Sequence, residues 1–156
     1  MLFRNLNSPD PSSSLIPELS DGLPTIAAFA RLCGHAVAGE IQAVPLSVEA
    51  LALVAASKPS GIFEIRGSKD GFESTERFLA VCVEIESDQR LLFRDKSNPR
   101  RTMQFLEGFR QLCQSGFVFH HLMKDFSLSK SGYELAETLI VDDYREQIEF
   151  AIKVEH

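Results

Sequence analysis

The spacing of apolar residues changes at Gly61, and this change constrains the fold more than any other feature of the chain. Before Gly61, apolar residues recur at helical spacing over residues 50–55. After it, residues 62–66 and 78–86 alternate with a period of two, which is typical of strands. A sheet with one apolar face must bury that face against another layer, so the sequence predicts an α+β fold.

The alternating part of the sequence predicts a β-meander. Residues 67–71, Gly-Ser-Lys-Asp-Gly, indicate a turn because their two glycines can adopt positive φ. Ser87-Asp88-Gln89 would then reverse the chain into a further strand at residues 91–94. We therefore expect two or three strands that must bury one face against helices. The side chains expected on that face are Leu79, Val81, Val83 and Ile85.

Two helices are predicted before the meander. The first covers residues 25–38, where apolar residues recur at helical spacing after Pro24. The second begins after Ser47, whose hydroxyl can cap the first backbone amides, and ends at the Lys-Pro-Ser-Gly sequence of residues 58–61.

A longer helix is predicted after the meander. Asn98 is expected to cap it, Pro99 to occupy its first position and Gly116 to end it. Its apolar stripe consists of Met103, Phe105, Leu106, Phe109, Leu112 and Cys113.

The remaining sequence predicts a β-ribbon and closing helices. Two short strands are expected at residues 117–121 and 125–128, and Ser129 is expected to cap a helix over residues 130–139. Residues 141–154 are predicted to form a last helix. Its apolar stripe, which suits either the core or a dimer seam, consists of Tyr144, Ile148 and Ile152.

The succession of a helix, a glycine, a short ribbon and a closing helix resembles the wing region of bacterial winged-helix domains. More closely, residues 46–139 resemble a group of uncharacterised bacterial winged-helix-like modules. The matching motifs are residues that begin or end helices and strands, and they contain no set of reactive groups. They are Ala55-Ala56-Ser57, Gly61-Ile62-Phe63, Asn98-Pro99-Arg100 and Leu112 with Gly116-Phe117-Val118. The Leu128-Ser129 pair with Gly132 carries the resemblance to the wing and closing helix.

This resemblance implies a winged-helix-like domain with an inserted β-meander, N-terminal helices and C-terminal closing helices. It also implies an accessory role in regulation or interaction. Because winged-helix proteins often dimerise through a terminal helix, it favours the dimer seam on residues 141–154. The meander takes the place of the helix-turn-helix pair that precedes a DNA-reading wing, which argues against groove reading by residues 99–113.

Length and composition set the domain organisation. A chain of 156 residues corresponds to one domain. Its first 22 residues combine three prolines with a run of three serines and bury too little apolar surface to offset the entropy of ordering. The sequence therefore predicts a flexible tail over residues 1–22 and a single domain over residues 23–156.

Several classes of protein are disfavoured by the sequence. No segment has the roughly 18 apolar residues of a membrane span, and no secretory signal is present. Cys33, Cys82 and Cys113 are an odd number at wide spacing, which fits neither a disulfide framework nor a CxxC metal site. We therefore expect a cytoplasmic protein without a metal, a cofactor or a membrane contact.

Charge is distributed unevenly along a chain whose net charge is −6. Residues 90–130 hold 8 basic and 3 acidic side chains, against 6 and 12 in residues 1–89 and 2 and 7 in residues 131–156. Such clustering is what a phosphate-binding face needs, although these cations could also balance acidic neighbours. The candidates for binding a nucleic acid or another anionic partner are Arg94, Lys96, Arg100, Arg101, Arg110 and Lys124.

No complete catalytic constellation is present. His120 and His121 are adjacent on a predicted strand, so they face opposite sides and cannot chelate one metal together. Residues 127–130 have S-x-x-K spacing, but the serine precedes the helix and the companion motifs are missing. Glu84 and Glu86 share a strand face without a nucleophile nearby.

The leading hypothesis is therefore a non-catalytic regulatory or protein-interaction module of winged-helix type, with a protein partner or a second copy as its ligand. The alternative is a DNA-binding transcriptional regulator that uses the basic helix and the wing. A basic face pairs equally well with an acidic protein, so charge alone does not separate the two hypotheses.

Overall fold

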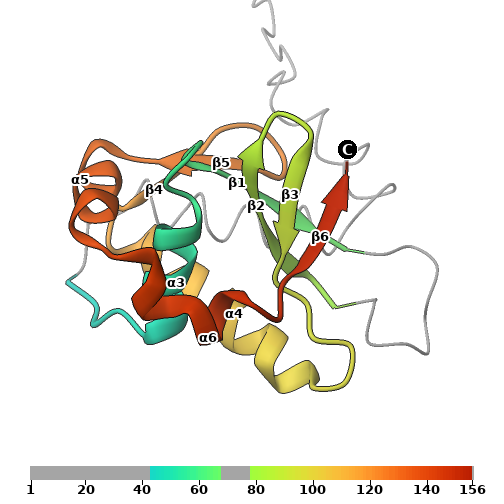
Figure 1. Ribbon diagram of the computed structural model, residues 1–156. Coiled ribbons are helices and arrows are strands. Elements are labelled where there is room, and N and C mark those ends of the chain that lie inside the picture. Colours follow the sequence, from blue (N-terminus) through green and yellow to red (C-terminus); the bar gives the residue numbers. More distant parts are fainter. Residues whose placement is uncertain (1–42, 68–77, 156) are drawn as a thin grey trace, which may run out of the picture.

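Strands from separate parts of the chain join into one antiparallel sheet (Figure 1). The computed structural model describes residues 43–67 and 78–155. Within them the sheet has six strands in the order β4-β5-β1-β2-β3-β6. The strands are β1 (Ile62–Arg66), β2 (Ala80–Glu86), β3 (Gln89–Leu92), β4 (Val118–His120), β5 (Asp125–Leu128) and β6 (Ile152–Glu155).

The alternating apolar pattern gives the sheet two different faces, as predicted. Phe63 and Ile65 of β1 and Val81 and Val83 of β2 are fully buried in the main core. The residues between them in sequence lie on the opposite face, because side chains alternate along a strand. On that face a smaller apolar cluster forms from Ala80, Cys82 and Leu92, with Ile152 and Val154 packed against it.

Helices pack against one face of the sheet (Figure 1). They are α3 (Val48–Ala56), α4 (Pro99–Gln114), α5 (Lys130–Thr138), the 3₁₀ turn η2 (Val141–Tyr144) and α6 (Arg145–Ile148). The predicted caps of α3 and α5 are confirmed, since Ser47 Oγ accepts from the Ala50 N–H at 3.3 Å and Ser129 Oγ from the Gly132 N–H at 3.2 Å. These local hydrogen bonds satisfy backbone donors that a helix start leaves unpaired.

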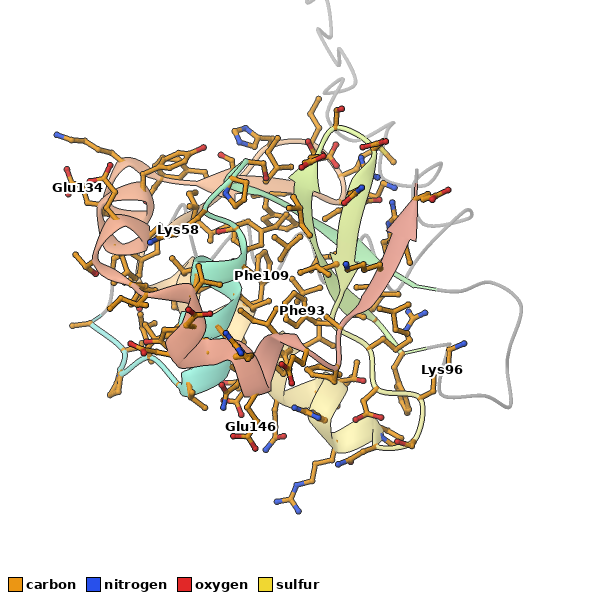
Figure 2. The ribbon with its side chains drawn as sticks, viewed as in Figure 1. Lys58, Phe93, Lys96, Phe109, Glu134 and Glu146 are labelled. Carbon is orange, nitrogen blue, oxygen red and sulfur yellow. The ribbon has the colours of Figure 1, made fainter. Side chains whose placement is uncertain are left out.

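Aromatic rings fill the space between the helices and the sheet. The Phe109 ring of α4 lies 5.6 Å from the ring of Phe63 and 5.0 Å from that of Phe126. A second group forms around Phe93, whose ring is 4.9 Å from that of Phe105. Figure 2 shows Phe93 and Phe109 pointing into the interior. Such rings each bury a large apolar surface, and they join α4 to both halves of the sheet.

Asn98 occupies the N-cap position of α4 and Pro99 its first position, as predicted, but capping by the Asn98 side chain is not observed. Asn98 makes no side-chain cap hydrogen bond. The turn before α4 is held by Asp95 instead, whose Oδ1 accepts from the N–H of Ser97 at 3.0 Å and from that of Asn98 at 2.9 Å. An acceptor three residues upstream thus organises this turn.

The predicted last helix over residues 141–154 is confirmed for its first part, residues 141–148, and is wrong for the rest. Helical structure ends at Ile148, and Ile152–Glu155 forms strand β6 against β3. The Phe150 ring packs 6.0 Å from Phe93 and 5.1 Å from Phe105, which anchors the chain between the last helical turn and the strand. The residues of β6, in which apolar and charged side chains alternate, then pair with the edge of β3. This tertiary pairing overrides the helical spacing of the apolar residues.

The α+β class and the order of helix, meander, helix, hairpin and helix over residues 46–139 are confirmed. The meander and the hairpin are not separate, because β1 pairs with β2 on one side and with β5 on the other. The predicted tail at residues 1–22, the helix at 25–38 and most of the turn at 67–71 lie outside the described residues.

Candidate functional site

A buried carboxylate lies on the face of the sheet opposite the helices. Glu64 is 7% exposed, although its sequence neighbours Phe63 and Ile65 point into the main core. Strand alternation therefore turns Glu64 to the opposite face. A buried charge is costly unless it is paired and hydrogen-bonded, so its partners decide what this position can do.

Three cations from three separate segments surround Glu64. Its Oε2 accepts from Arg90 Nη1 at 3.2 Å and lies 3.2 Å from Arg66 Nε. Its Oε1 accepts from Lys124 Nζ in the β4–β5 turn. We call these four residues the Glu64 cluster. The cluster ties β1 to β3 and to the hairpin, because each segment contributes a charge to one carboxylate.

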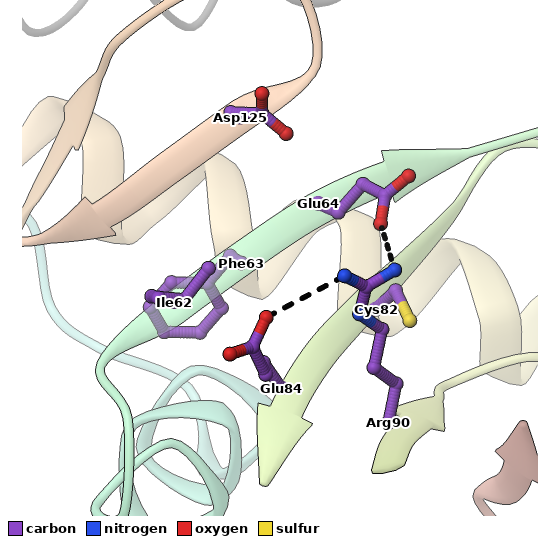
Figure 3. Close-up of a pocket in the computed structure, with 7 residues that line it drawn as sticks. All are labelled: Ile62, Phe63, Glu64, Cys82, Glu84, Arg90 and Asp125. Carbon is purple, nitrogen blue, oxygen red and sulfur yellow. Dashed lines mark hydrogen bonds and ion pairs between the residues drawn. The ribbon is translucent and has the colours of Figure 1, made fainter. Parts of the chain in front are cut away.

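Arg90 extends the cluster to a second carboxylate. Its Nη2 lies 3.5 Å from Glu84 Oε2, and Figure 3 shows its guanidinium between the two acids. Glu84 and Arg90 are direct cross-strand neighbours of β2 and β3. A shallow hollow of about 90 Å³ opens beside them. It is lined by Ile62, Phe63, Glu64, Cys82, Glu84, Arg90 and Asp125.

The environment shifts two titratable groups in this region. Burial on its own would raise the pKa of Glu64, but the hydrogen bond from Lys124 and the charges of Arg66, Lys124 and Arg90 outweigh it and lower the pKa below its ordinary value. Burial raises the pKa of the neighbouring Cys82 thiol to about 11. Glu64 is thus ionised and paired at neutral pH, and Cys82 stays protonated.

This arrangement suits a structural ion network better than catalysis. An ionised carboxylate held by three cations is a poor general acid, and a protonated buried thiol is a poor nucleophile. Within residues 43–67 and 78–155, no three His, Cys, Asp or Glu side chains gather where they could hold a metal ion. The hollow is also smaller than typical small-molecule sites, which are about 300–1,000 Å³.

The six predicted basic residues do not form one continuous surface. Arg94 is 8% exposed, and its Nη2 donates to the Phe78 carbonyl oxygen at 2.9 Å. Lys124 lies in the hairpin, where it bonds to Glu64. These two cations therefore lie apart from the surface of α4, and both make contacts within the chain.

The other four basic residues lie on α4 or just before it. Arg101 stacks over the Phe150 ring at 3.9 Å and donates to the Glu146 carbonyl oxygen at 3.0 Å. Arg100 is exposed in the first turn of α4. Lys96 is exposed in the preceding loop (Figure 2). One end of α4 thus brings together three of the predicted cations.

Arg110 lies farther along α4 and is engaged by a neighbour on the same helix. Its Nε donates to Glu107 Oε2 at 2.8 Å and its Nη2 to Glu107 Oε1 at 2.5 Å. This bidentate pair places a carboxylate next to the cation, which reduces the positive potential at the middle of the helix.

Sequence reasoning missed an exposed apolar group on the β4–β5 hairpin. Phe119 is 48%, Leu122 75% and Met123 57% exposed. We call these three residues the hairpin surface. The signal in the sequence is the Leu-Met pair in the connection between two strands, where polar turn residues are usual.

The backbone of this turn is held in an uncommon conformation. Met123 has φ of 52°, in the left-handed region that residues other than glycine rarely adopt. His120 Nε2 donates to the Met123 carbonyl oxygen at 2.8 Å, and the His120 ring lies 4.7 Å from that of Phe126. The histidine therefore links the turn to the core.

His121 points to the other side of β4, as the adjacent-histidine argument predicted. Its Nε2 shares a hydrogen bond of 2.7 Å with Ser127 Oγ. A serine next to a histidine is the start of a nucleophilic site, but the histidine needs a third group to orient it. Among the described residues no carboxylate bonds to His121, so the pair forms no triad.

The three residues of the predicted dimer seam do not share a helical stripe. Tyr144 and Ile148 are partly buried against the main core, from η2 and α6. Ile152 lies in β6 and packs against the smaller cluster on the opposite face of the sheet. Helical structure therefore carries Tyr144 and Ile148 but not Ile152, so the predicted seam does not lie on one helix.

Comparisons with known proteins add no assignment to this geometry. Across residues 43–67 and 78–155, none of the helices has the length and apolar character that crossing a bilayer requires. No family model, no curated protein and no solved structure matches the chain.

Proposed function

We propose that this chain is a non-catalytic protein-interaction module of winged-helix type, and that its hairpin surface contacts the partner protein. The observation that carries the proposal is the exposure of Phe119, Leu122 and Met123 within one short hairpin. Exposed large apolar side chains that gather in one place commonly mark interaction sites.

The chemistry of these side chains suits a protein contact. Aromatic residues are frequent among those that dominate binding energy, and methionine adapts to irregular surfaces. The left-handed backbone at Met123 costs of order 1–2 kcal/mol, and such strain concentrates at functional positions. The hydrogen bond from His120 keeps the turn in this conformation.

The basic residues support a nucleic-acid role less well. Arg94, Arg101, Arg110 and Lys124 are all engaged with oxygen atoms of this chain. A DNA-binding surface needs several outward cations that can replace counterions on phosphates. Lys96 and Arg100 are exposed near the start of α4, and two cations are a small footprint for that task.

Site-specific photocrosslinking in cells that express the chain tests the proposal. A photoreactive amino acid replaces Leu122 in the hairpin, or the exposed Glu137 of α5 as the matched control. We expect a discrete protein adduct from position 122 that is absent from position 137. The partner, identified from the adduct and purified, should bind the wild-type chain about tenfold or more tightly than the Phe119→Ser, Leu122→Ser variant.

A duplex-DNA titration at low and moderate salt provides the opposing test. Binding at low salt that weakens with salt and with the Lys96→Ala, Arg100→Ala variant would contradict the proposal and favour the DNA-binding regulator. Equal crosslinking from positions 122 and 137 would also contradict it. Circular dichroism of each variant controls for folding.

A further inference from the structure

Among the residues that the structure describes, the edge strand β6 has main-chain partners on one side only, in β3. The Phe93 N–H donates to the Val81 carbonyl oxygen of β2 at 2.9 Å, so alternate residues of β3 direct their main-chain groups to β2. The groups of Arg90 and Leu92 then face β6, where their partners are Val154 and Ile152. By the same alternation, the N–H and C=O groups of Lys153 and Glu155 point away from the sheet.

The outward-facing residues of β6 carry opposite charges. Lys153 and Glu155 are both exposed, and they lie two positions apart on one face of the strand. A sheet edge with unpaired main-chain groups is a template for another strand, and a lone cation on that edge would disfavour the pairing. An alternating cation and anion can instead complement a second copy of the same strand.

Two-fold symmetry selects one register for such a pairing. In an antiparallel pair, outward residues must meet outward residues, so Lys153 can oppose either itself or Glu155 of the second copy. A register centred on Lys153 places Lys153 opposite Lys153 of the second copy. A register centred on Glu155 places Glu155 opposite Glu155. Only the register centred on Val154 joins opposite charges, and it does so twice.

The apolar face of β6 fits the same register. Val154 and Ile152 pack against Ala80, Cys82 and Leu92 on the face opposite the helices. With Val154 at the two-fold axis, it meets Val154 of the second copy as a non-hydrogen-bonded pair, in which side chains approach most closely. The apolar cluster therefore continues across the junction.

We propose that two copies of this chain associate by antiparallel pairing of β6 with β6, with Lys153 opposite Glu155 of the second copy. This goes beyond the proposed function, because β6 and the hairpin strand β4 lie at opposite edges of the sheet. The dimer would be one continuous sheet with a hairpin surface at each end, and two linked sites raise avidity for a repeated partner.

The dimer is expected to be weak. Two four-residue strands bury much less than the roughly 800 Å² per partner of a standard interface. Preordered strands do not lose backbone entropy on pairing, which favours a second copy over an unfolded peptide. We therefore expect a dissociation constant on the order of micromolar to millimolar.

Analytical ultracentrifugation of the full chain over this concentration range tests the proposal with charge reversals. Lys153→Glu alone and Glu155→Lys alone each place like charges together twice, and each should weaken association about tenfold. The double variant restores opposite charges and should return association to within about threefold of wild type. Glu137→Lys on α5 is the control and should leave association unchanged.

A proline substitution probes the backbone separately. Glu155→Pro removes an N–H that points away from the sheet, so it should abolish association while circular dichroism stays native. A monomer at all concentrations, or a double charge reversal that fails to rescue, would overturn the β6 pairing. Association that depends on Phe119 instead would also overturn it. A monomer or a failed rescue has no bearing on the hairpin crosslink, so the β6 pairing can fail while the proposed function stands.

Discussion

At the scale of single residues, Glu64 controls the charge balance on the face of the sheet opposite the helices. Its two carboxylate oxygens meet Arg66, Arg90 and Lys124. Removing one member of a buried ion network lowers the free energy of unfolding by more than the intact network contributes to it, because the remaining charges are left unpaired. The partners here reach water in part, which limits this cost.

We expect Glu64→Gln to lower the free energy of unfolding by about 2 kcal/mol at pH 7. The pKa of Glu64 is lowered in the folded state, so its contribution is present above the unfolded pKa near 4.3 and is lost as pH falls through the folded value. The difference between wild type and variant should therefore shrink below about pH 4. Urea denaturation of wild type and variant, at pH 7 and below about pH 4, measures this difference in the free energy of unfolding.

The exposed Glu86 at the end of the neighbouring strand β2 supplies the control for this experiment. Glu86→Gln should change the free energy of unfolding by less than about 0.5 kcal/mol. An equal effect of both substitutions at pH 7, or a Glu64 effect that does not shrink as the pH falls below about 4, would contradict the account of the cluster.

The caps at Ser47 and Ser129 could be predicted because their acceptors and donors lie three residues apart. The Glu64 cluster could not. Its carboxylate meets Arg90 and Lys124, which are 26 and 60 residues away in the sequence. Only the strand order brings these groups together, so a buried acid in an apolar strand was the sole local signal.

At the scale of elements, the contact between α3 and α4 depends on the absence of a side chain at Gly108. A β-carbon there would lie 2.7 Å from the Ala50 backbone nitrogen and 3.1 Å from the Ala50 α-carbon. Backbone atoms of a helix cannot move aside as a flexible side chain can. Small residues on both helices therefore set how closely the helices approach.

Gly108→Ala is expected to destabilise the protein by about 1–3 kcal/mol. In an exposed helix the same change would add about 1 kcal/mol of stability, so the sign separates close packing from helix propensity. Gln104→Ala on the exposed side of α4 is the matched control and should change stability by less than about 0.5 kcal/mol. Thermal and urea unfolding measure both variants. A stabilised Gly108→Ala variant would contradict the helix contact described above.

The C-terminal elements explain why one prediction of secondary structure was wrong. Tyr144, Ile148 and Ile152 have helical spacing, but Ile152 and Val154 also alternate with Lys153 and Glu155. Short segments that satisfy both periods are decided by what they can pack against. Here the edge of β3 accepts residues 152–155, a partner that local spacing does not reveal.

At the scale of the whole molecule, the sheet unites segments that the sequence predicts separately. The meander and the hairpin were both predictable, since each pairs strands close in sequence. Their union through β1 and β5 was not, because Phe63 pairs with Phe126 across most of the described chain. The basic stretch at residues 90–130 behaves in the same way, since several of its cations bond to distant acids or carbonyl oxygens.

If this union makes one cooperative unit, both faces of the sheet should open together. Cys113 lies in the main core and Cys82 on the opposite face, and both are buried. Burial raises the pKa of Cys82 to about 11, which slows its reaction further in the native state. In a Cys33→Ser background, thiol labelling over a urea series should give the same midpoint for both cysteines. Labelling of Cys82 well before Cys113 would contradict cooperativity, since it would place the opening of β3 and β6 below global unfolding. Peptide mapping of each thiol distinguishes the two outcomes.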